Sequence, residues 1–339
     1  MTVSDLGEHA LLARLLARLP RPGAHILVGP GDDAAVIEPG RRTRLVVTTD
    51  ALVEHVHFSR AWCSPADIGH KALAVNLSDL AAMGAVPRWA LVSLALPPDL
   101  DVDAAEALMS GLAEHARSHG VSVAGGNLTR SPQGLVVDIT AGGEVSPRKW
   151  LLRSGGRPGD DLWVSGRLGG ARAGLEMFES GRNPDGDTGA EACGLRHRRP
   201  APRVRLGIAL ARVGAARAAM DLSDGLADAV CQLATASGCG ARVNADSVPV
   251  EPGARAWWTS TGRESVLEAI RGGEDYELLF AVPPRWSGRL RHVRQQVAEP
   301  ALTRIGVLTR PRDLVLTRKG RDEAWPSGFE HFRAGDARD

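Results

Sequence analysis

The first half of the chain carries helical patterns of hydrophobic residues. Leucines at helical spacing over residues 11–19 predict an amphipathic helix near the start. Residues 65–84 predict a longer helix with Ser64 as its N-cap, and residues 101–119 predict another helix that Gly120 closes. The first half therefore contains at least three predicted helices.

Short apolar runs between these helices predict strands. They cover residues 44–49, 89–96, 121–124 and 135–144. The first run ends on Asp50, and the third stops at Gly125-Gly126-Asn127, so polar side chains stand where strands are expected to end. Glycine-rich strand ends let a ligand approach the backbone closely, which makes these positions candidates for a binding site.

The second half repeats this mixture after a stretch rich in Gly, Arg and Pro. Because of that stretch, at residues 153–160, we expect a domain boundary near Trp150. Strands are predicted at 160–166 and near Val243, Leu278 and Val315, and helices at 169–180, 202–213 and 224–237. Residues 181–202, with the basic run from Arg196 to Arg199, are expected to form a loop. The predicted class is α/β or α+β, with one lobe over 1–150 and a second over 151–339.

Composition narrows the function classes. The chain has 339 residues, 43% of them hydrophobic, and a formal net charge of +1, so no global field attracts nucleic acid or an anionic membrane. Its four cysteines form no C-x-x-C pair, which suits a reducing cytoplasm and argues against a disulfide framework or a structural zinc site. No run of about 18 apolar residues predicts a membrane-spanning helix. We expect a cytoplasmic protein without nucleic-acid or membrane partners.

Acidic residues gather at glycines and at predicted element ends. The set comprises Asp32, Asp33, Asp50, Asp79, Asp221, Asp224, Glu274 and Asp275. Most of them, taken singly, can also be explained as turn or cap residues. Asp79 differs, because it stands inside the apolar helix pattern KALAVNLSDLAAMGA, where an unpaired carboxylate is costly to bury.

These carboxylates would repel one another if the fold brought them together. Two unit charges ~4 Å apart cost about 4 kcal/mol at an effective dielectric of 20, so several require a cation. Oxygen ligands favour Mg²⁺ or Mn²⁺ over zinc, and Mg²⁺ held by a few carboxylates commonly serves substrate phosphates. The acidic set therefore points to a nucleotide-using enzyme.

Two other nucleotide motifs do not fit. The chain contains no G-x-x-x-x-G-K-[ST], and the loose G-x-G-x-x-A match at 29–34 is followed too soon by Pro39 for a dinucleotide-binding helix. His55 and His57 alternate along a segment expected to be extended, so they face one side of it. Three explanations stay open: both are polar strand residues, both are metal ligands, or one of them contacts a substrate.

The ordered motifs GDDAAV, TTDALVEHVHF, KALAVNLSDLAAMGA, LRSGGRPGD, MDLSDG, GGEDYELLF and GFEHF span nearly the whole chain. Together they resemble the thiamine-monophosphate kinases. The resemblance implies transfer of the γ-phosphoryl group of ATP to thiamine monophosphate. It also implies a fold shared with aminoimidazole ribonucleotide synthetase and selenophosphate synthetase, with an N-terminal lobe that dimerises through its sheet and a C-terminal α/β lobe. The nucleotide would lie near the interface of a homodimer.

The resemblance further implies roles for individual residues. Ligands of several Mg²⁺ ions would be Asp33, Thr48, Thr49, Asp50, Asp79, Asn127, Asp221 and Asp224. ATP contacts would be Gly126, Asn127, Arg153 and Ser223, and thiamine-monophosphate contacts would be His57, Glu274 and Phe329. The nucleophile would be an ionised phosphate oxygen of the substrate, so no catalytic base is expected.

Three positions depart from the family pattern. Asn127 stands where an aspartate is usual, His55 where a glycine is common, and Phe329 where some relatives have tyrosine. Two rival interpretations remain. One is ATP-driven activation of an amide or a selenide on the same fold, and the other is a non-catalytic paralogue, which the neutral Asn127 would favour.

Overall fold

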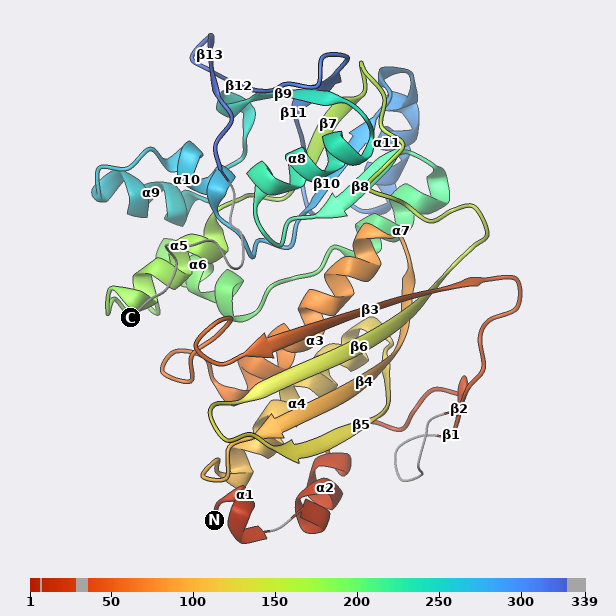
Figure 1. The fold of residues 1–339 in the computed structure, drawn as a ribbon, viewed down its shortest axis with the longest axis vertical. Helices are drawn as coiled ribbons and strands as arrows, with labels where there is room; N and C mark the ends of the chain where they lie inside the picture. Colours follow the sequence, from red (N-terminus) through yellow and green to blue (C-terminus); the bar gives the residue numbers. More distant parts are fainter. Residues whose placement is uncertain (7, 29–35, 328–339) are drawn as a thin grey trace. The chain divides into compact units, whose positions relative to one another are not determined.

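The protein divides into two compact units, which meet in sequence between Trp150 and Leu151. The structure is a computed structural model, and it describes residues 1–6, 8–28 and 36–327. Unit 1 comprises Met1–Trp150 and unit 2 comprises Leu151–Asp339. Each unit mixes helices and strands around its own sheet, so the α/β class with two lobes is confirmed (Figure 1).

Unit 1 is built on a four-stranded sheet of order β3-β6-β4-β5. The strands are β3 (Arg44–Val53), β4 (Val86–Leu96), β5 (Ser122–Arg130) and β6 (Val136–Val145). The pairs β3–β6 and β4–β6 are antiparallel and the pair β4–β5 is parallel. The small elements of this unit are α1 (Val3–Leu6), α2 (Glu8–Leu16), β1 (Ile26–Val28) and β2 (Val36–Ile37).

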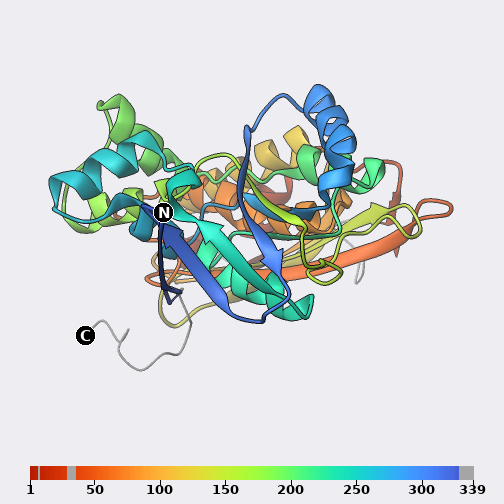
Figure 2. The ribbon, with the colours of Figure 1, turned by 90° about the horizontal axis from the view of Figure 1, so that it is seen from above.

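Two long helices, α3 (Pro65–Ala82) and α4 (Val102–His119), cover one face of this sheet, as Figures 1 and 2 show. The strands alternate accordingly, and Val137, Ile139 and Ala141 on the helix side are fully buried. We call the opposite side the open face; it carries Leu45 and Val47, which are more than half exposed. This arrangement decides which predicted site residues share a side of the sheet.

Local sequence explains the two helices well. Ser64 caps α3 in a capping box with Asp67, as its position predicted, and Gly120 closes α4 in the left-handed region at φ 67°. The helices approach closely where Gly69 faces the backbone of Leu108, because a Cβ at Gly69 would overlap the Leu108 carbonyl oxygen. The predictions for these two helices are confirmed.

Two strands of unit 1 continue past their predicted ends. β3 continues through Asp50 to Val53 because β6 pairs with it along its whole length, so Asp50 does not end the strand. β5 likewise runs through Gly125-Gly126-Asn127 to Arg130, paired with β4. The predictions that one strand ends at Asp50 and that another stops at Gly125-Gly126-Asn127 are therefore wrong.

Unit 2 contains a seven-stranded sheet of order β13-β12-β9-β11-β7-β10-β8. Its strands are β7 (Asp161–Ser165), β8 (Ala218–Asp221), β9 (Gly240–Asn244), β10 (Leu278–Val282), β11 (Leu302–Thr309), β12 (Leu314–Arg318) and β13 (Arg321–Ala324). Its helices are α5 (Gly170–Glu179), α6 (Thr188–Arg198), α7 (Val204–Val213), α8 (Leu226–Ala236), α9 (Pro252–Ser260), α10 (Ser265–Arg271) and α11 (Ser287–Gln296). A continuous hydrophobic core lies between this sheet and its helices.

Helix α6 replaces the loop expected over residues 181–202. Its sequence has little amphipathic pattern, but Asp187 caps it and Cys193 is fully buried where α6 packs on α5. Gly174 of α5 permits that packing, because a Cβ there would overlap the Cys193 carbonyl oxygen. Tertiary contact, rather than local periodicity, stabilises this helix.

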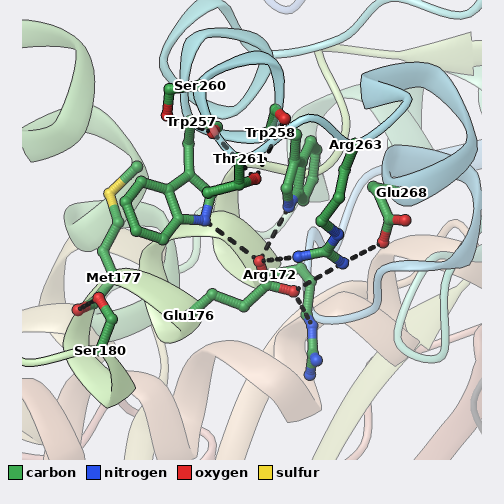
Figure 3. A network of polar contacts seen from close by, with 10 residues as sticks. All are labelled: Arg172, Glu176, Met177, Ser180, Trp257, Trp258, Ser260, Thr261, Arg263 and Glu268. Atoms are coloured by element: carbon green, nitrogen blue, oxygen red, sulfur yellow. Dashed lines mark hydrogen bonds and ion pairs between the residues drawn. The ribbon is translucent and has the colours of Figure 1, made fainter.

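Helix α9 is joined to α5 by one carboxylate. Figure 3 shows Glu176 accepting hydrogen bonds from the indole nitrogens of Trp257 and Trp258, at 3.2 and 2.9 Å. Arg263 donates to the same carboxylate from Nη1 at 2.8 Å, and Arg172 donates from Nε at 3.0 Å. The cluster of α5, α6 and α9 is thus held by directed polar contacts as well as by packing.

Within the described residues, none of the helices is both long and apolar enough to cross a bilayer.

Candidate active site

In unit 1 the fold joins two of the predicted magnesium ligands directly. The Thr48 hydroxyl donates a hydrogen bond to the Asp79 carboxylate, which links β3 to α3. Asp79 is half-buried rather than fully buried, so solvent or a ligand can reach it. Asp50 lies opposite the buried Ile139, so it faces the same side of the sheet as Thr48. Thr48, Asp50 and Asp79 therefore form an oxygen-rich group at the helix side of β3.

Thr49 and Asn127 face the other way. Thr49 Oγ1 donates to Asp138 Oδ1 at 3.2 Å on the open face. Asn127 of β5 is paired with Ser93 of β4, and Ser93 is paired with Asp138 of β6, so Asn127 lies on the same face as Asp138. β3 and β5 are the two edges of the sheet, separated by two strands, or roughly 14 Å. One copy of the chain therefore does not place Asn127, or its neighbour Gly126, beside Asp50.

The segment around His57 is a turn, so the prediction of an extended strand with two aligned histidines is wrong. His55 adopts φ 69°, and the Val53 amide donates to His57 Nδ1 at 3.1 Å. Lys71, which is almost fully buried on α3, donates from Nζ to the His57 carbonyl at 2.9 Å. Lys71 thus holds the turn, and the His57 ring is oriented by the chain that precedes it.

In unit 2 the sequence MDLSDG forms a tight loop at the end of β8. Asp221 is the last residue of that strand and is 4% exposed. Gly225, at φ 94°, is the N-cap of α8, so Asp224 stands one position before the cap. A Cβ on Gly225 would lie 2.7 Å from the carbonyl oxygen of Gly272, and only glycine permits that approach.

The GGEDYE loop is fastened to this first loop by backbone hydrogen bonds. The Glu274 amide donates to the Ser223 carbonyl at 2.6 Å, and the Tyr276 amide donates to the Leu222 carbonyl at 3.0 Å. Glu274 and Tyr276 both adopt left-handed backbone conformations, at φ 65° and 49°. Such strained positions persist only where surrounding contacts over-determine them, which is common at ligand sites.

Two acids of the GGEDYE loop are committed to the fold. Asp275 accepts from the amides of Gly169 and Ala171 at the start of α5, at 2.6 and 3.3 Å. Burial raises the pKa of Asp275 to about 7, against the opposing effect of those two amides. Glu277 is fully buried and accepts from Ser165 at 2.6 Å and from Arg203 Nε at 2.6 Å.

Glu274 is the acid of this loop that remains accessible. Its side chain is 24% exposed, and its Oε2 lies 3.0 Å from Nδ1 of His197. Arg153 is also exposed and donates from Nη1 to Gln232 of α8 at 2.5 Å. The basic run, expected in a loop, instead lies at the end of α6, where Arg196 pairs with Glu251 at 3.1 Å.

The oxygen donors fit magnesium chemically, but neither unit assembles a complete ligand set from described residues. Over residues 1–6, 8–28 and 36–327, no three His, Cys, Asp or Glu side chains converge as a metal site. Asp33 and Phe329 lie outside the described residues. Carboxylates and a hydroxyl are the donors that Mg²⁺ prefers, and the Thr48–Asp79 contact shows that two of them meet.

Comparison with known proteins defines the class. Residues 31–145 match the N-terminal domain of the AIR synthase related proteins, and residues 157–319 match the C-terminal domain of the same class. A thiamine-monophosphate kinase from Salmonella typhimurium is 37% identical, over 96% of this chain and 98% of its own. The chain belongs to the thiamine-monophosphate kinase family.

Solved structures agree with this assignment. The crystal structure of a thiamine-monophosphate kinase from Stenotrophomonas maltophilia K279a is 37% identical, with a TM-score of 0.79 over 93% of this chain and 96% of that one. The structure of "AaThiL complexed with AMPPCP and TMP" is 31% identical, with a TM-score of 0.75 over 98% of this chain and 99% of that one. The predicted family and fold are therefore confirmed along nearly the whole chain.

Proposed function

We propose that the chain transfers the γ-phosphoryl group of ATP to thiamine monophosphate and so produces thiamine diphosphate. Full-length membership of the thiamine-monophosphate kinase family supports this reaction. The structural observation that carries it is the fastening of the MDLSDG loop to the GGEDYE loop through Ser223 and Glu274. That contact places the MDLSDG loop, whose Asp221, Ser223 and Asp224 suit a metal-bound nucleotide, beside Glu274. The accessible carboxylate of Glu274 suits a cationic substrate.

The residues present suit a transfer without a catalytic base. The attacking group would be a phosphate oxygen of thiamine monophosphate, which is already ionised at neutral pH. In unit 1, Thr48, Asp50 and Asp79 would hold Mg²⁺, and in unit 2 Asp221 and Asp224 would hold Mg²⁺, which when bound neutralises phosphate charge. Arg153 is exposed beside α8, and its guanidinium can form paired hydrogen bonds to a phosphate.

The roles of substrate contacts follow from accessibility. Because Asp275 and Glu277 are committed to the fold, Glu274 is the acid of its loop that we assign to the cationic part of thiamine monophosphate. His57, whose ring is fixed by the Val53 amide, is our second proposed substrate contact. Phe329 and Asp33 stay in the proposed site on sequence resemblance.

We also propose a cytoplasmic homodimer. Asn127 and Asp50 stand at opposite edges of one sheet, so a site using both would draw them from two copies. The exposed apolar residues Leu45 and Val47 on the open face support pairing through that face. Single cysteines, of which Cys193 and Cys239 are buried as free thiols, suit a reducing compartment.

The test is ADP release measured with thiamine monophosphate and with unphosphorylated thiamine, each with Mg²⁺ and with EDTA. We expect turnover with thiamine monophosphate and Mg²⁺ only, and thiamine diphosphate as the product by chromatography. ADP release with an amide or selenide acceptor instead would favour another reaction on this fold. Nucleotide binding without turnover on any acceptor would favour a non-catalytic paralogue.

A further inference from the structure

Two segments of unit 2 carry an excess of positive charge. Residues 203–220 and 278–298 each contain four arginines and no aspartate or glutamate. The first segment includes α7 and the second includes α11, and these two helices pack against each other. The formal net charge of +1 therefore conceals a local excess. The expectation that nucleic acid is not attracted rests on the total charge and does not extend to this surface.

The arginines of the second segment are exposed and have no acidic partner. We give the name α11 arginine cluster to four exposed side chains: Arg285, Arg289, Arg291 and Arg294. Over residues 1–6, 8–28 and 36–327, no carboxylate forms an ion pair with any of them. By contrast, Arg263 and Arg304 of the same unit pair with Glu176 and Asp161, at 2.8 and 2.6 Å. The described chain therefore does not neutralise the charge of the cluster.

The indole ring of Trp286 holds part of the cluster in place. The Cζ atoms of Arg289 and Arg285 lie 4.5 and 6.0 Å from the centroid of this ring, and that of Arg217 lies 5.2 Å from it. Among the residues that the structure describes, only Arg217 of these three has a carboxylate partner, Asp160, at 3.0 Å. Stacking on a ring orders a guanidinium group without neutralising it and without using its N–H donors.

The cluster lies along both sides of the outer face of α11. Leu290 is buried and marks the side of the helix that packs on unit 2. Arg289 donates from Nη1 to the Gly214 carbonyl at 2.9 Å, so it lies on the side toward the end of α7. Arg291 and Arg294 are three positions apart, so they are neighbours, and helical periodicity places them on the opposite side.

The polar character of this face indicates which polyanion it fits. Between the two sides α11 exposes His292 and Gln295, and no large hydrophobic side chain is exposed in residues 203–220 or 278–298. A membrane surface or a protein partner binds chiefly through apolar contacts, which this face does not offer. A single-stranded nucleic acid is held by its phosphates, to which guanidinium groups donate paired hydrogen bonds, and by bases that stack on arginine planes.

The dimensions also favour a single strand. The ten residues of α11 span about 15 Å, which exceeds one phosphate group and suits several successive phosphates. α7 packs along one side of α11 and the buried side of α11 packs on unit 2, so the helix does not protrude as a helix that enters a duplex groove must.

We propose that the outer face of α11, with the α11 arginine cluster and Trp286, binds single-stranded RNA through its phosphate backbone and without sequence preference. This binding surface is separate from the kinase reaction proposed above and does not depend on it.

The experiment measures binding of a fluorescein-labelled oligouridylate of about twelve nucleotides to the full chain by fluorescence anisotropy. EDTA is present, so that Mg²⁺ does not bridge the oligomer to the acidic residues. With about four phosphate contacts, log Kd should rise with log KCl concentration at a slope near 3, since each contact in a single strand contributes about 0.7.

The first variant, Arg291→Gln with Arg294→Gln, removes two charges whose side chains make no hydrogen bond or ring contact within the described residues, so the fold should be unaffected. We expect binding at about 50 mM KCl to weaken at least tenfold and the salt slope to fall by about 1.4. Arg285→Gln with Arg289→Gln should have the same two effects on binding.

The matched control is Arg255→Gln with Arg321→Gln, which removes the same net charge from exposed positions of α9 and β13 in unit 2. It should weaken binding less than about twofold and leave the salt slope unchanged. The melting temperature of every variant is measured beside its affinity.

Three results would overturn the inference. The first is no binding of the oligouridylate at low salt, and the second is equal weakening by the cluster variants and by the control. The third is preference for another polyanion: displacement of the RNA by an equal concentration of oligoglutamate of the same length would favour an acidic protein partner. Cluster-dependent binding to phosphatidylserine vesicles with none to RNA would likewise replace RNA by a membrane surface.

Discussion

At the scale of single residues, a substitution of Asp79 should abolish ATP turnover and leave the protein folded. Asp79→Ala removes the carboxylate that accepts from Thr48 and that we assign to Mg²⁺. We expect loss of ATP turnover, while the free energy of unfolding without Mg²⁺ changes by less than about 1 kcal/mol, because charge repulsion is relieved as one hydrogen bond is lost. Steady-state ADP release and urea unfolding measure the two quantities.

Asp67→Ala is the matched control on the same helix. Asp67 completes the capping box of α3 with Ser64, at the opposite end from Asp79. Its loss should cost about 1 kcal/mol of stability and leave turnover intact. Full activity in Asp79→Ala would contradict the metal assignment.

Asn127 offers a change in the opposite direction. Asn127→Asp adds a charge at an exposed position of β5, and we expect it to lower the Mg²⁺ concentration that gives half-maximal activity. The gain should be severalfold at most, because nearby carboxylates repel the new charge. Activity is measured against Mg²⁺ at saturating ATP. An unchanged midpoint would remove Asn127 from the metal site, whereas activity only in the variant would favour the paralogue interpretation.

Asp275 should give unit 2 a distinctive pH dependence. Because burial raises its pKa from 3.8 to about 7, the folded carboxyl keeps a proton that the unfolded one has lost. Its contribution to stability is complete below the unfolded pKa and is lost as the pH rises through about 7. The free energy of unfolding of wild type, minus that of Asp275→Asn, should fall between about pH 4 and pH 7 and level off above that. A difference that is flat or rises with pH would contradict this prediction.

At the scale of elements, Glu176 is the contact that holds α9 on α5. Burial alone would raise the pKa of Glu176, but hydrogen bonds from Arg263 and Trp258 outweigh it and lower that pKa. Glu176→Gln should cost about 2 kcal/mol of stability, since it leaves the buried indole of Trp258 and the two arginines with a poorer acceptor. Chemical denaturation at neutral pH measures the loss. Glu191→Gln, an exposed site on α6, is the control and should change stability by less than about 0.5 kcal/mol.

The elements differ in how far their sequence predicts them. α4 carries strong hydrophobic periodicity and α3 is a long, mostly apolar segment, with end signals at Gly120 and Ser64, and both were predicted nearly to the residue. α6 was missed because its residues lack that periodicity and its stability comes from contact with α5. β3 and β5 were predicted too short, because their last residues are fixed by pairing with partner strands rather than by their own composition.

At the scale of the whole molecule, the homodimer is the prediction that decides how the site is completed. Light scattering should give twice the chain mass of 35.9 kDa at micromolar concentration. Val47→Glu places a charge on the open face and should shift the protein toward monomer, with activity falling in parallel. Val56→Glu changes a similarly exposed valine in the turn after β3 and should leave the mass unchanged. A monomeric wild type would refute the proposal.

The sequence by itself determined the fold class, the family and which residue types gather at glycine-rich turns. These are properties of local pattern and of motifs in order, and they need no knowledge of distant contacts. The Thr48–Asp79 contact was not predicted as such, although both residues were already among the expected ligands of the Mg²⁺ ions.

Only the tertiary structure decided which acids face a ligand and which support the fold. Glu274, Asp275 and Glu277 are close neighbours in one motif, yet Glu277 is buried against Ser165, Asp275 caps α5, and Glu274 stays accessible beside His197. Sheet register likewise separated Asn127 from Asp50. Burial and pairing depend on chain segments that are distant in sequence and meet only on folding, so no local pattern of these residues encodes them.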